Sequence, residues 1–303
     1  MIYRTTELRH SQSSNIDMLS AGEVASILHS GQMAAVRAVE EAIPAIIQAA
    51  SMLAERVQKG GNIVYCAAGS SGLMALADGL ELPGTYGISN NRIKILFAGG
   101  DACLKNLLGG PEDDEELAVQ DVARSGLGSD DTIIALSASG STPYAVKALQ
   151  LAQEVGAKSI ALANNDNAPL LNIADIAILL PTPPEVIAGS TRMGAGSAQK
   201  VALNMISTLM AIELGHVHDG HMVNVVADNE KLKQRARGMI MDIAGCDEGA
   251  ARTALDQSGG AVKLAVLIAS GANNPDAAKD LLERNGQKLR PSLSALKQSR
   301  GSN

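Results

Sequence analysis

The sequence predicts an α/β fold: a doubly wound parallel sheet of five strands in flavodoxin-like order, with helices before it and a small helical domain after it. The first observation is a series of short, nearly continuous apolar runs, at 62–68, 92–100, 132–140, 159–164 and 176–182. Runs without alternation are typical of parallel strands covered on both faces. The second observation is that helical patterns lie between the runs, notably at 113–125 and 143–155. Strands that alternate with helices form right-handed crossovers in one sheet.

The composition is that of a globular chain with an aliphatic core. Of 303 residues, 46% are hydrophobic and 19% are charged, and there is no Trp, one Phe and four Tyr. A net charge of -7 and the scarcity of aromatic residues argue against nucleic-acid binding. No apolar run approaches the roughly 18 residues of a membrane span. We therefore expect neither a nucleic acid nor a membrane as partner.

The cysteines and the N-terminus indicate a cytoplasmic protein. Cys66, Cys103 and Cys246 lie far apart and form no CxxC pair, which favours reduced thiols over a zinc site. The first 18 residues are polar and expected to be extended, and they lack the apolar segment of a signal peptide. The expected localisation is cytoplasmic.

The chain is expected to divide into three parts. Residues 1–60 form an N-terminal helical segment packed on the sheet domain, residues 61–243 form that domain, and residues 244–303 form a small helical domain. After Pro184 the pattern becomes purely helical, with a long helix expected at about 192–214 and another at about 227–244.

Several helix boundaries can be placed from capping patterns. Ser20 and Glu23 have the spacing of a capping box, and Pro44 is expected to kink or divide the helical pattern of 32–58. Asp247 and the pair Asn274-Pro275 are expected helix starts in the C-terminal part.

Two loops at strand ends carry clustered hydroxyl groups and glycine. The first strand ends in AAGSSG at 67–72, and the third ends in SASGST at 137–142, before Pro143 opens a helix. In a flavodoxin-like order these strands flank the switch point, where ligands bind outside the carboxyl ends. Either loop alone is also explained as a tight turn of small residues, but two at the switch point favour an anion site. The candidate phosphate ligands are Ser70, Ser71, Ser137, Ser139, Ser141 and Thr142.

Further motifs accompany these two loops. They are AGSSG and the pattern D-x-x-E-x-P-x-T-Y-G within 68–87, AGGD and GGPEDDEE within 98–116, SASGSTPY at 137–144, EVGAKSIAL at 154–162, EVIAGSTRMGAGSAQKVALNMIST at 185–208, MV and NEKLKQRA within 222–236 and AGCDEGAARTAL at 244–255. Together they resemble the N-acetylmuramic acid 6-phosphate etherases, a family with the sugar isomerase (SIS) fold. The resemblance runs from about residue 5 to 295 and includes the small C-terminal helical domain.

The resemblance implies a lyase that needs neither metal nor cofactor. The family cleaves the D-lactyl ether of N-acetylmuramic acid 6-phosphate, giving N-acetylglucosamine 6-phosphate and D-lactate, in cell-wall sugar recycling. Two family glutamates match Glu81 and Glu112, the latter implied to remove the C2 proton and the former to protonate the departing lactate. From residues alone, the acidic run around Glu112 is typical of a solvated helix start, and Glu81 of an exposed helix end before a Pro-Gly turn.

The segment 189–200, GSTRMGAGSAQK, opens the long helix, and Ser190 is a candidate cap. By resemblance this segment closes over the sugar phosphate and brings Ser190 and Lys200 to the ligand. A surface helix lysine is the competing interpretation of Lys200.

The run HVHDGH at 216–221 brings three histidines together but has no partner at a zinc-ligand spacing. We expect no metal site there, and a loop or a subunit contact instead.

The chain departs from the etherase pattern close to the expected site. Leu73 and Ser141 stand where the family usually has arginine, and Leu80, Leu82 and Gly84 replace Ser, Cys and Pro around the glutamate. The chain is therefore identified as a divergent member.

The leading expectation is an etherase that binds a small phosphosugar and forms a homodimer whose partner chain contributes to the pocket, as SIS domains do. Two alternatives remain open: a non-catalytic phosphosugar-binding regulator and an aldose-ketose phosphosugar isomerase. No basic helix-turn-helix segment precedes residue 20, which argues against a transcriptional regulator.

Overall fold

The computed structural model describes residues 5–227 and 229–301, and it contains the predicted sheet. Five parallel strands lie in the order β2-β1-β3-β4-β5. Their bounds are Ile63–Ala67 for β1, Ile93–Phe97 for β2, Thr132–Ser137 for β3, Lys158–Ala163 for β4 and Ile176–Leu179 for β5. The five apolar runs are thus confirmed as strands, and the switch point falls between β1 and β3 as expected.

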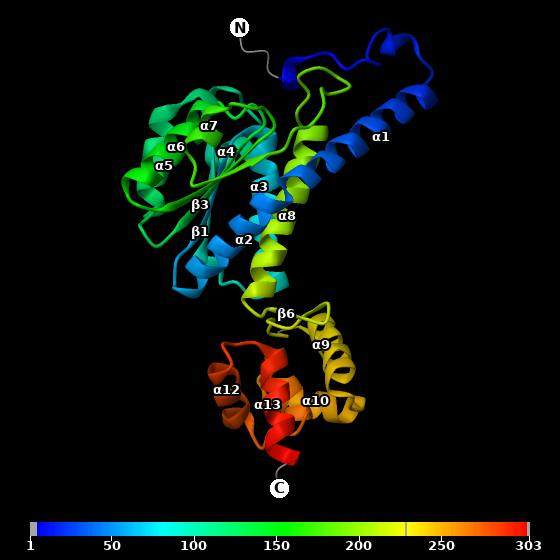
Figure 1. The fold of residues 1–303 in the computed structure, drawn as a ribbon, viewed down its shortest axis with the longest axis vertical. Helices are drawn as coiled ribbons and strands as arrows, with labels where there is room; N and C mark the ends of the chain where they lie inside the picture. Colours follow the sequence, from blue (N-terminus) through cyan, green and yellow to red (C-terminus); the bar gives the residue numbers. More distant parts are fainter. Residues whose placement is uncertain (1–4, 228, 302–303) are drawn as a thin grey trace. The chain divides into compact units, whose positions relative to one another are not determined.

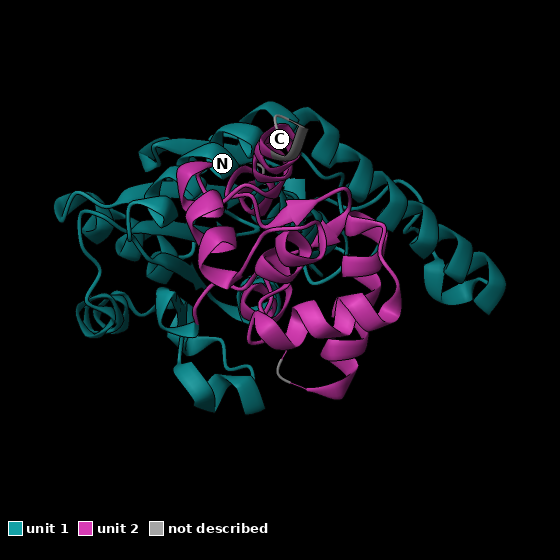
Figure 2. Cartoon of the chain, turned by 90° about the horizontal axis from the view of Figure 1, so that it is seen from below, with its two compact units in different colours: residues 1–80, 90–209 teal, residues 81–89, 210–303 magenta. Residues whose placement is uncertain are grey.

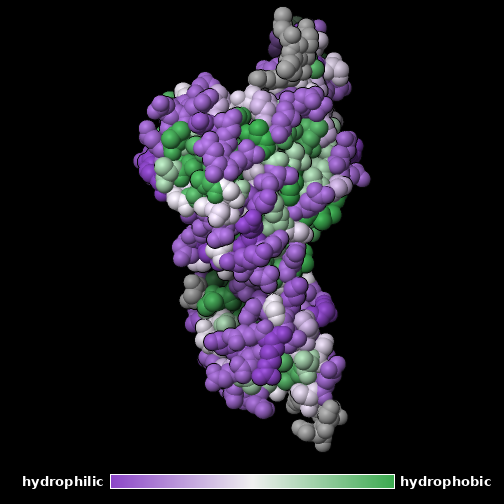
Figure 3. All heavy atoms as spheres, turned by 60° about the vertical axis from the view of Figure 1, so that its left-hand side comes forward, coloured by the Kyte–Doolittle hydropathy of each residue, from purple (hydrophilic) through white to green (hydrophobic). Residues whose placement is uncertain are grey.

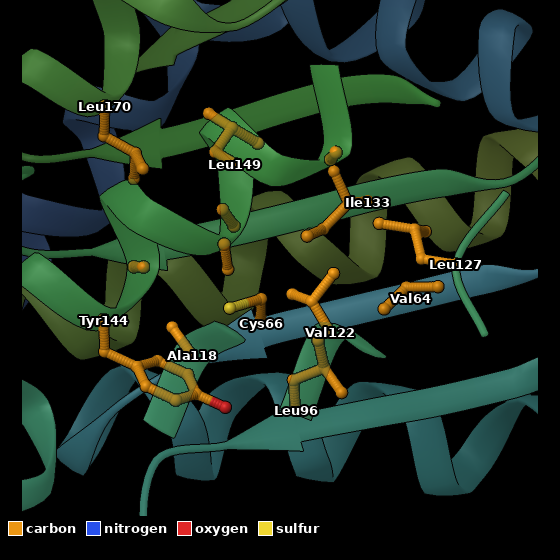
Figure 4. Close-up of a cluster of buried hydrophobic side chains, with 14 of the residues drawn as sticks. Val64, Cys66, Leu96, Ala118, Val122, Leu127, Ile133, Tyr144, Leu149 and Leu170 are labelled. Carbon is orange, nitrogen blue, oxygen red and sulfur yellow. The ribbon is translucent and has the colours of Figure 1, made fainter. Parts of the chain in front are cut away.

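One face of the sheet is covered by helices that follow β2, β3 and β4 (Figure 1). Val64 and Cys66 of β1 and Ile133 of β3 point to this face and pack against Val122 and Leu149 (Figure 4). The cluster is aliphatic apart from Cys66 and Tyr144, and its side chains are shielded from water. The helices are α4 (Gly100–Lys105), α5 (Glu115–Ser125), α6 (Pro143–Glu154) and α7 (Pro169–Ile173).

The opposite face carries α3 (Gly69–Tyr86), packed closely on the strands. A Cβ at Gly79 would lie 3.1 Å from the Tyr65 ring, and one at Gly72 would lie 2.5 Å from the Phe97 ring. The helix therefore approaches the sheet at glycine positions, where no side chain separates the two.

The N-terminal segment is helical beyond its first turns. It contains α1 (Ala21–Arg37), the 3-10 helix η3 (Ala38–Ala42) and α2 (Ile43–Gln58), with Pro44 in the first turn of α2. The Ser20–Glu23 capping box and the division at Pro44 are both confirmed. The expected extended start is wrong for part of the described chain, because Thr5–Glu7 (η1) and Ile16–Met18 (η2) are 3-10 turns.

The chain separates into two compact units, drawn in different colours in Figure 2. The first comprises residues 1–80 and 90–209, and the second comprises residues 81–89 and 210–303. The division falls within α3 and within the long helix α8 (Gly194–Glu213), whereas the last domain was expected at 244–303.

The second unit has a small core of its own. Its elements are the hairpin β6 (Val217–His218) and β7 (His221–Met222), then α9 (Glu230–Ala244), α10 (Glu248–Gln257), α11 (Val262–Ala269), α12 (Pro275–Arg284) and α13 (Leu289–Gly301). Asp247 and Asn274 cap α10 and α12, as predicted. Val223, Ile240, Val262 and Val266 are fully buried in the core that these elements share.

The three thiols occupy different places. Cys66 is buried in β1, Cys103 is buried in α4, and Cys246 is half-buried between α9 and α10. Polar side chains cover most of the face shown in Figure 3, with hydrophobic groups in small patches. Among the described residues, no helix has both the length and the apolar character that a bilayer span requires.

Candidate active site

A cavity of about 440 Å³ opens where β1 and β3 end. All of its walls belong to the first unit. They are formed by the starts of α3 and α6, the 3-10 helix η5 (Gly110–Asp113), the N-terminal turn η1 and the loop before α8. Its lining residues are Thr6, Glu7, Ala68, Gly69, Ser70, Ser71, Glu112, Asp113, Ser137, Ala138, Ser139, Ser141, Thr142, Pro143, Gly189 and Thr191.

The start of α3 forms the first wall. Gly69 has a φ of 53°, which turns the chain sharply from β1 into the helix. The first hydrogen bond of the helix runs from Gly72 N to Ala68 O at 3.0 Å. The N–H groups of Gly69, Ser70 and Ser71 precede it and, as in any helix, have no partner within the helix. They lie at the positive end of the helix dipole and suit an anion.

The loop from Ser137 to Thr142 forms the second wall and is held by its own hydroxyl groups. Ser137 Oγ lies 2.8 Å from Thr142 Oγ1 and 3.2 Å from Ser139 Oγ, and it accepts a hydrogen bond from Gly140 N at 2.9 Å. Ser139 Oγ in turn accepts from Ser141 N and Ser141 Oγ, both at 3.2 Å. The loop is thereby pre-formed beside the start of α6.

Gly140 is the position in this loop that no larger residue could fill. Its φ is 66°, and an added Cβ would lie 2.3 Å from the Ala168 Cβ and 2.8 Å from the Ala163 Cβ. The close approach lets Gly140 O accept a hydrogen bond from Leu170 N at 2.9 Å, which ties the loop to α7.

Glu112 brings a carboxylate to the start of α3. A Cβ at Gly69 would lie 3.8 Å from Glu112 Oε2, so the carboxylate stands over the turn between β1 and α3. Burial, and then the neighbouring charge of Asp113, raises the pKa of the Glu112 carboxyl. A carboxylate with a raised pKa is a stronger base, and the arrangement can remove a proton from a molecule bound in the cavity.

Seven of the ten residues that the sequence nominated line this one cavity. They are Ser70, Ser71, Glu112, Ser137, Ser139, Ser141 and Thr142. Glu81, Ser190 and Lys200 are not among the lining residues.

Lys200 belongs to a buried network beneath α3. Its Nζ donates to Asn204 Oδ1 at 2.8 Å, and Asn204 Nδ2 donates to Asp78 Oδ1 at 2.7 Å. Asp78 is 2% exposed and also accepts from Tyr65 OH at 2.7 Å and from Ser207 Oγ at 3.1 Å. Burial raises the pKa of Asp78, although these donors oppose the rise. The network joins α3, β1 and α8.

The start of α8 is covered by a carboxylate of the chain itself. Glu185 is 6% exposed, and its two oxygens accept hydrogen bonds from Gly194 N and Ala195 N, each at 2.9 Å. The helix begins at Gly194, so the expectation that Ser190 caps it is wrong. Glu185 takes that role because its charge interacts favourably with the helix dipole.

Glu81 lies near the other end of α3. The expected Pro-Gly turn after it is wrong, because the helix continues through Pro83 to Tyr86 and ends before Gly87, whose φ is 65°. Glu81 is twelve residues beyond Gly69, which corresponds to roughly 18 Å along a helix axis.

Thr6 and Glu7 line the cavity although they were not expected there, whereas Gly189 and Thr191 belong to the segment 189–200 that was expected at the ligand. Thr6 N donates to Asn165 Oδ1 at 3.3 Å, Asn165 Nδ2 donates to Thr6 Oγ1 at 3.0 Å, and Gly189 N donates to Thr6 O at 3.2 Å. The polar N-terminal stretch contains no motif that indicates a place at the cavity. Only the pairing with a residue 159 positions away brings it to the cavity.

Two of the departures from the etherase pattern alter the charge near the cavity. Ser141 lines it, and Leu73 lies half-buried in the first turns of α3. No lysine or arginine is among the described residues that line the cavity. Gly84 faces open space near the end of α3. An anion here is therefore met by N–H groups, hydroxyls and helix dipoles rather than by side-chain cations.

The three histidines lie at the hairpin of β6 and β7, with His216 just before β6. His218 pairs with His221 across the turn, and each has a carboxylate near it: His218 Nε2 lies 3.5 Å from Asp219, and His221 Nε2 lies 3.7 Å from Asp242. Burial and Lys263 lower the pKa of His216 to about 4. In the part of the chain that the structure describes, no three His, Cys, Asp or Glu side chains gather as metal ligands do.

Comparison with known proteins identifies the fold and the family of the chain. Two models, both described as the SIS domain, match residues 28–164 and 116–214. A phosphoheptose isomerase from Francisella tularensis superposes with a TM-score of 0.50 at 22% identity, covering 64% of this chain and all of that one. At that identity the likeness concerns the fold.

Sequence relatives extend over nearly the whole chain. The N-acetylmuramic acid 6-phosphate etherase of Clostridium beijerinckii is 39% identical over 281 residues, covering 93% of this chain and 92% of its own. That of Caldanaerobacter subterraneus subsp. tengcongensis is 40% identical over 278 residues, covering 92% and 91%. The chain belongs to the N-acetylmuramic acid 6-phosphate etherase family.

Proposed function

We propose that the protein is a lyase that cleaves the D-lactyl ether of N-acetylmuramic acid 6-phosphate, giving N-acetylglucosamine 6-phosphate and D-lactate. The observation that carries the proposal is the Glu112 carboxylate over the start of α3, in a cavity walled by two hydroxyl-rich loops. Relatives at about 39% identity over more than nine-tenths of the chain are named N-acetylmuramic acid 6-phosphate etherases, which supports the proposal.

The cavity contains two functional parts, a site for the phosphate and the base Glu112. The starts of α3 and α6 bind the 6-phosphate through N–H groups and the hydroxyls of Ser70, Ser139 and Ser141. The phosphate fixes the sugar so that, once the ring has opened to the aldehyde, C2 lies beside Glu112. The aldehyde acidifies the C2 proton, and Glu112 removes it.

Elimination then breaks the bond between C3 and the lactyl oxygen. The electron pair of the C2–H bond forms a C2–C3 double bond, and the departing oxygen takes a proton from Glu81. Water adds to the double bond, its hydroxyl to C3 and a proton to C2, which gives N-acetylglucosamine 6-phosphate. Two carboxyls, one ionised and one protonated, suffice for these transfers.

The proposed assembly is a homodimer in which Glu81 acts in the pocket of the other copy. Glu81 stands at the far end of α3 from Gly69 and does not line the cavity of its own chain. A shallow, mostly apolar hollow of about 450 Å³ lies along one face of α8, lined by Val201, Asn204, Met205, Thr208 and Leu209. A second copy would bury this face.

D-lactate release from N-acetylmuramic acid 6-phosphate tests the reaction. Enzyme-dependent release in step with N-acetylglucosamine 6-phosphate is expected. No release at high protein concentration would contradict the proposal, and ketose formation from a sugar phosphate would favour an isomerase. The cytoplasm is the proposed compartment, because all three cysteines are free thiols and free thiols persist in reducing surroundings.

Mixing two inactive variants tests the shared pocket. In a mixed dimer of Glu81→Gln and Glu112→Gln chains, one of the two pockets receives both native glutamates if they come from different copies. Random exchange then restores about a quarter of wild-type activity, because half of the dimers are mixed and each has one intact pocket. If both glutamates come from one chain, the mixture stays inactive.

A further inference from the structure

A third carboxylate, from a different part of the chain, shares the cavity with Glu112 and Asp113. Glu7 ends the N-terminal 3-10 turn η1 and lines the cavity together with Gly189 and Thr191. A Cβ at Gly189 would lie 3.6 Å from Glu7 Oε2, so this carboxylate stands over the loop before α8. Glu112 Oε2 stands instead over Gly69. Glu7 and Glu112 therefore enter the cavity from separate walls.

The segment that carries Glu7 is fixed in place. Thr6 is 2% exposed and Asn165 is 4% exposed, and two hydrogen bonds join them, at 3.0 and 3.3 Å. Asn165 Nδ2 also donates to Ala138 O at 2.9 Å, within the hydroxyl loop of the cavity. Gly189 N donates to Thr6 O. The residue before Glu7 is thus tied to two walls, which holds Glu7 at the cavity.

The Glu7 carboxylate has no internal partner. Among the described residues, none donates a hydrogen bond to it and none forms an ion pair with it, and its side chain is exposed. A carboxylate that is positioned by its backbone but unpaired can accept hydrogen bonds from a bound molecule. The starts of α3 and α6, by contrast, offer N–H donors, which suit phosphate oxygens.

We infer that Glu7 is a substrate-binding residue, whose carboxylate accepts hydrogen bonds from the hydroxyl or amide N–H groups of the sugar. A carboxylate repels the phosphate, so Glu7 recognises the sugar end of the ligand and not its phosphate. Glu7 thereby selects a sugar phosphate over inorganic phosphate and fixes which way round the ligand lies. This inference rests on the proposed function for the identity of the sugar.

The test measures binding rather than turnover. Calorimetric titrations of wild type, Glu7→Gln and Glu7→Asp would use three ligands: inorganic phosphate, glucose 6-phosphate and N-acetylglucosamine 6-phosphate. The Gln variant is expected to lose about tenfold in affinity for whichever sugar phosphate the wild type binds, since it loses a charged acceptor. The Asp variant, whose acceptor is one methylene short, is expected to fall between. Inorganic phosphate is expected to bind Glu7→Gln at least as tightly as it binds the wild type.

Glu41→Gln is the matched control, because Glu41 is an exposed carboxylate in η3 outside the cavity. It removes the same charge and is expected to leave all three affinities unchanged. The unfolding midpoint of Glu7→Gln is expected to equal that of the wild type, because no described residue bonds to the carboxylate that changes.

The outcomes separate this inference from the proposed function. If Glu7→Gln binds every sugar phosphate as the wild type does, or loses inorganic phosphate equally, the role of Glu7 is overturned, whether or not D-lactate is released. If the wild type prefers glucose 6-phosphate and Glu7→Gln loses that preference, the etherase substrate is contradicted while the role of Glu7 stands. If the wild type binds no sugar phosphate more tightly than inorganic phosphate, both are overturned.

Discussion

The helices α3 and α8 begin in similar sequences and end up with opposite surroundings. Both starts are rich in glycine and serine, SSG at 70–72 and GAGS at 194–197. The start of α3 faces the cavity, whereas the start of α8 is covered by the Glu185 carboxylate. Only the start of α3 is therefore open to a ligand anion, because the protein supplies its own carboxylate at the start of α8.

The largest effect is expected when the Glu112 carboxylate, the base that stands over the start of α3, is removed. Glu112→Gln keeps the shape of the side chain but cannot take up the C2 proton. We expect kcat for D-lactate release to fall by roughly 10² to 10⁴-fold. Affinity for N-acetylglucosamine 6-phosphate should be retained, as measured by titration. Glu115→Gln, which changes an exposed carboxylate outside the cavity, is the control, and equal loss there would contradict the assignment.

The next largest effect is a loss of stability when Glu185, which covers the start of α8, is removed. Glu185→Ala leaves Gly194 N and Ala195 N buried without their acceptor, which costs about 2 kcal/mol in the free energy of unfolding. Chemical denaturation measures the change. Glu154→Ala, which removes an exposed carboxylate at the end of α6, should change it little. A Glu185 variant as stable as the wild type would show that the cap contributes nothing.

A smaller effect is expected from a comparison of two hydroxyls, one in the loop before α6 and one in the loop before α8. Ser139→Ala removes an acceptor of two hydrogen bonds and a hydroxyl that faces the cavity. About 1 kcal/mol is expected, equivalent to roughly a fivefold rise in KM. Ser190→Ala, in the loop before α8, is expected to leave KM unchanged. Equal effects would mean that Ser190 contacts the substrate as Ser139 does.

The smallest effect is on pH dependence. The Asp113 charge contributes to the raised pKa of Glu112. Asp113→Asn removes that charge and lowers the pKa, so Glu112 remains an ionised base to lower pH. The acid limb of the kcat/KM profile should therefore move to lower pH. A shift to higher pH, or none, would indicate that Glu112 does not control that limb.

The fold could be predicted because its signals are local. Each strand is a short apolar run, and the capping patterns at Ser20, Asp247 and Asn274 act within three residues. The two hydroxyl loops were placed together by topology alone, since β1 and β3 are neighbours in this strand order.

What sequence reasoning missed depends on contacts between distant residues. Ser190 was chosen as a cap because it precedes the helix, but the acceptor comes from Glu185, nine residues before Gly194. Lys200 was expected at the ligand, but its Nζ donates to Asn204 within the same helix. Glu7 lies in a polar stretch, and its place depends on the pairing of Thr6 with Asn165.

The three thiols give the protein built-in reporters of local opening. A buried thiol reacts with an alkylating reagent only when the surrounding structure opens. Cys66 lies in the central sheet, where burial raises its pKa, and Cys103 lies in α4, close to Gly99 and before the segment that carries Glu112. Cys246 belongs to the second unit. The labelling rates of Cys66 and Cys103, resolved by peptide mass, would therefore time the opening of the sheet and of the Glu112 segment separately, and the half-buried Cys246 provides a more accessible thiol for comparison.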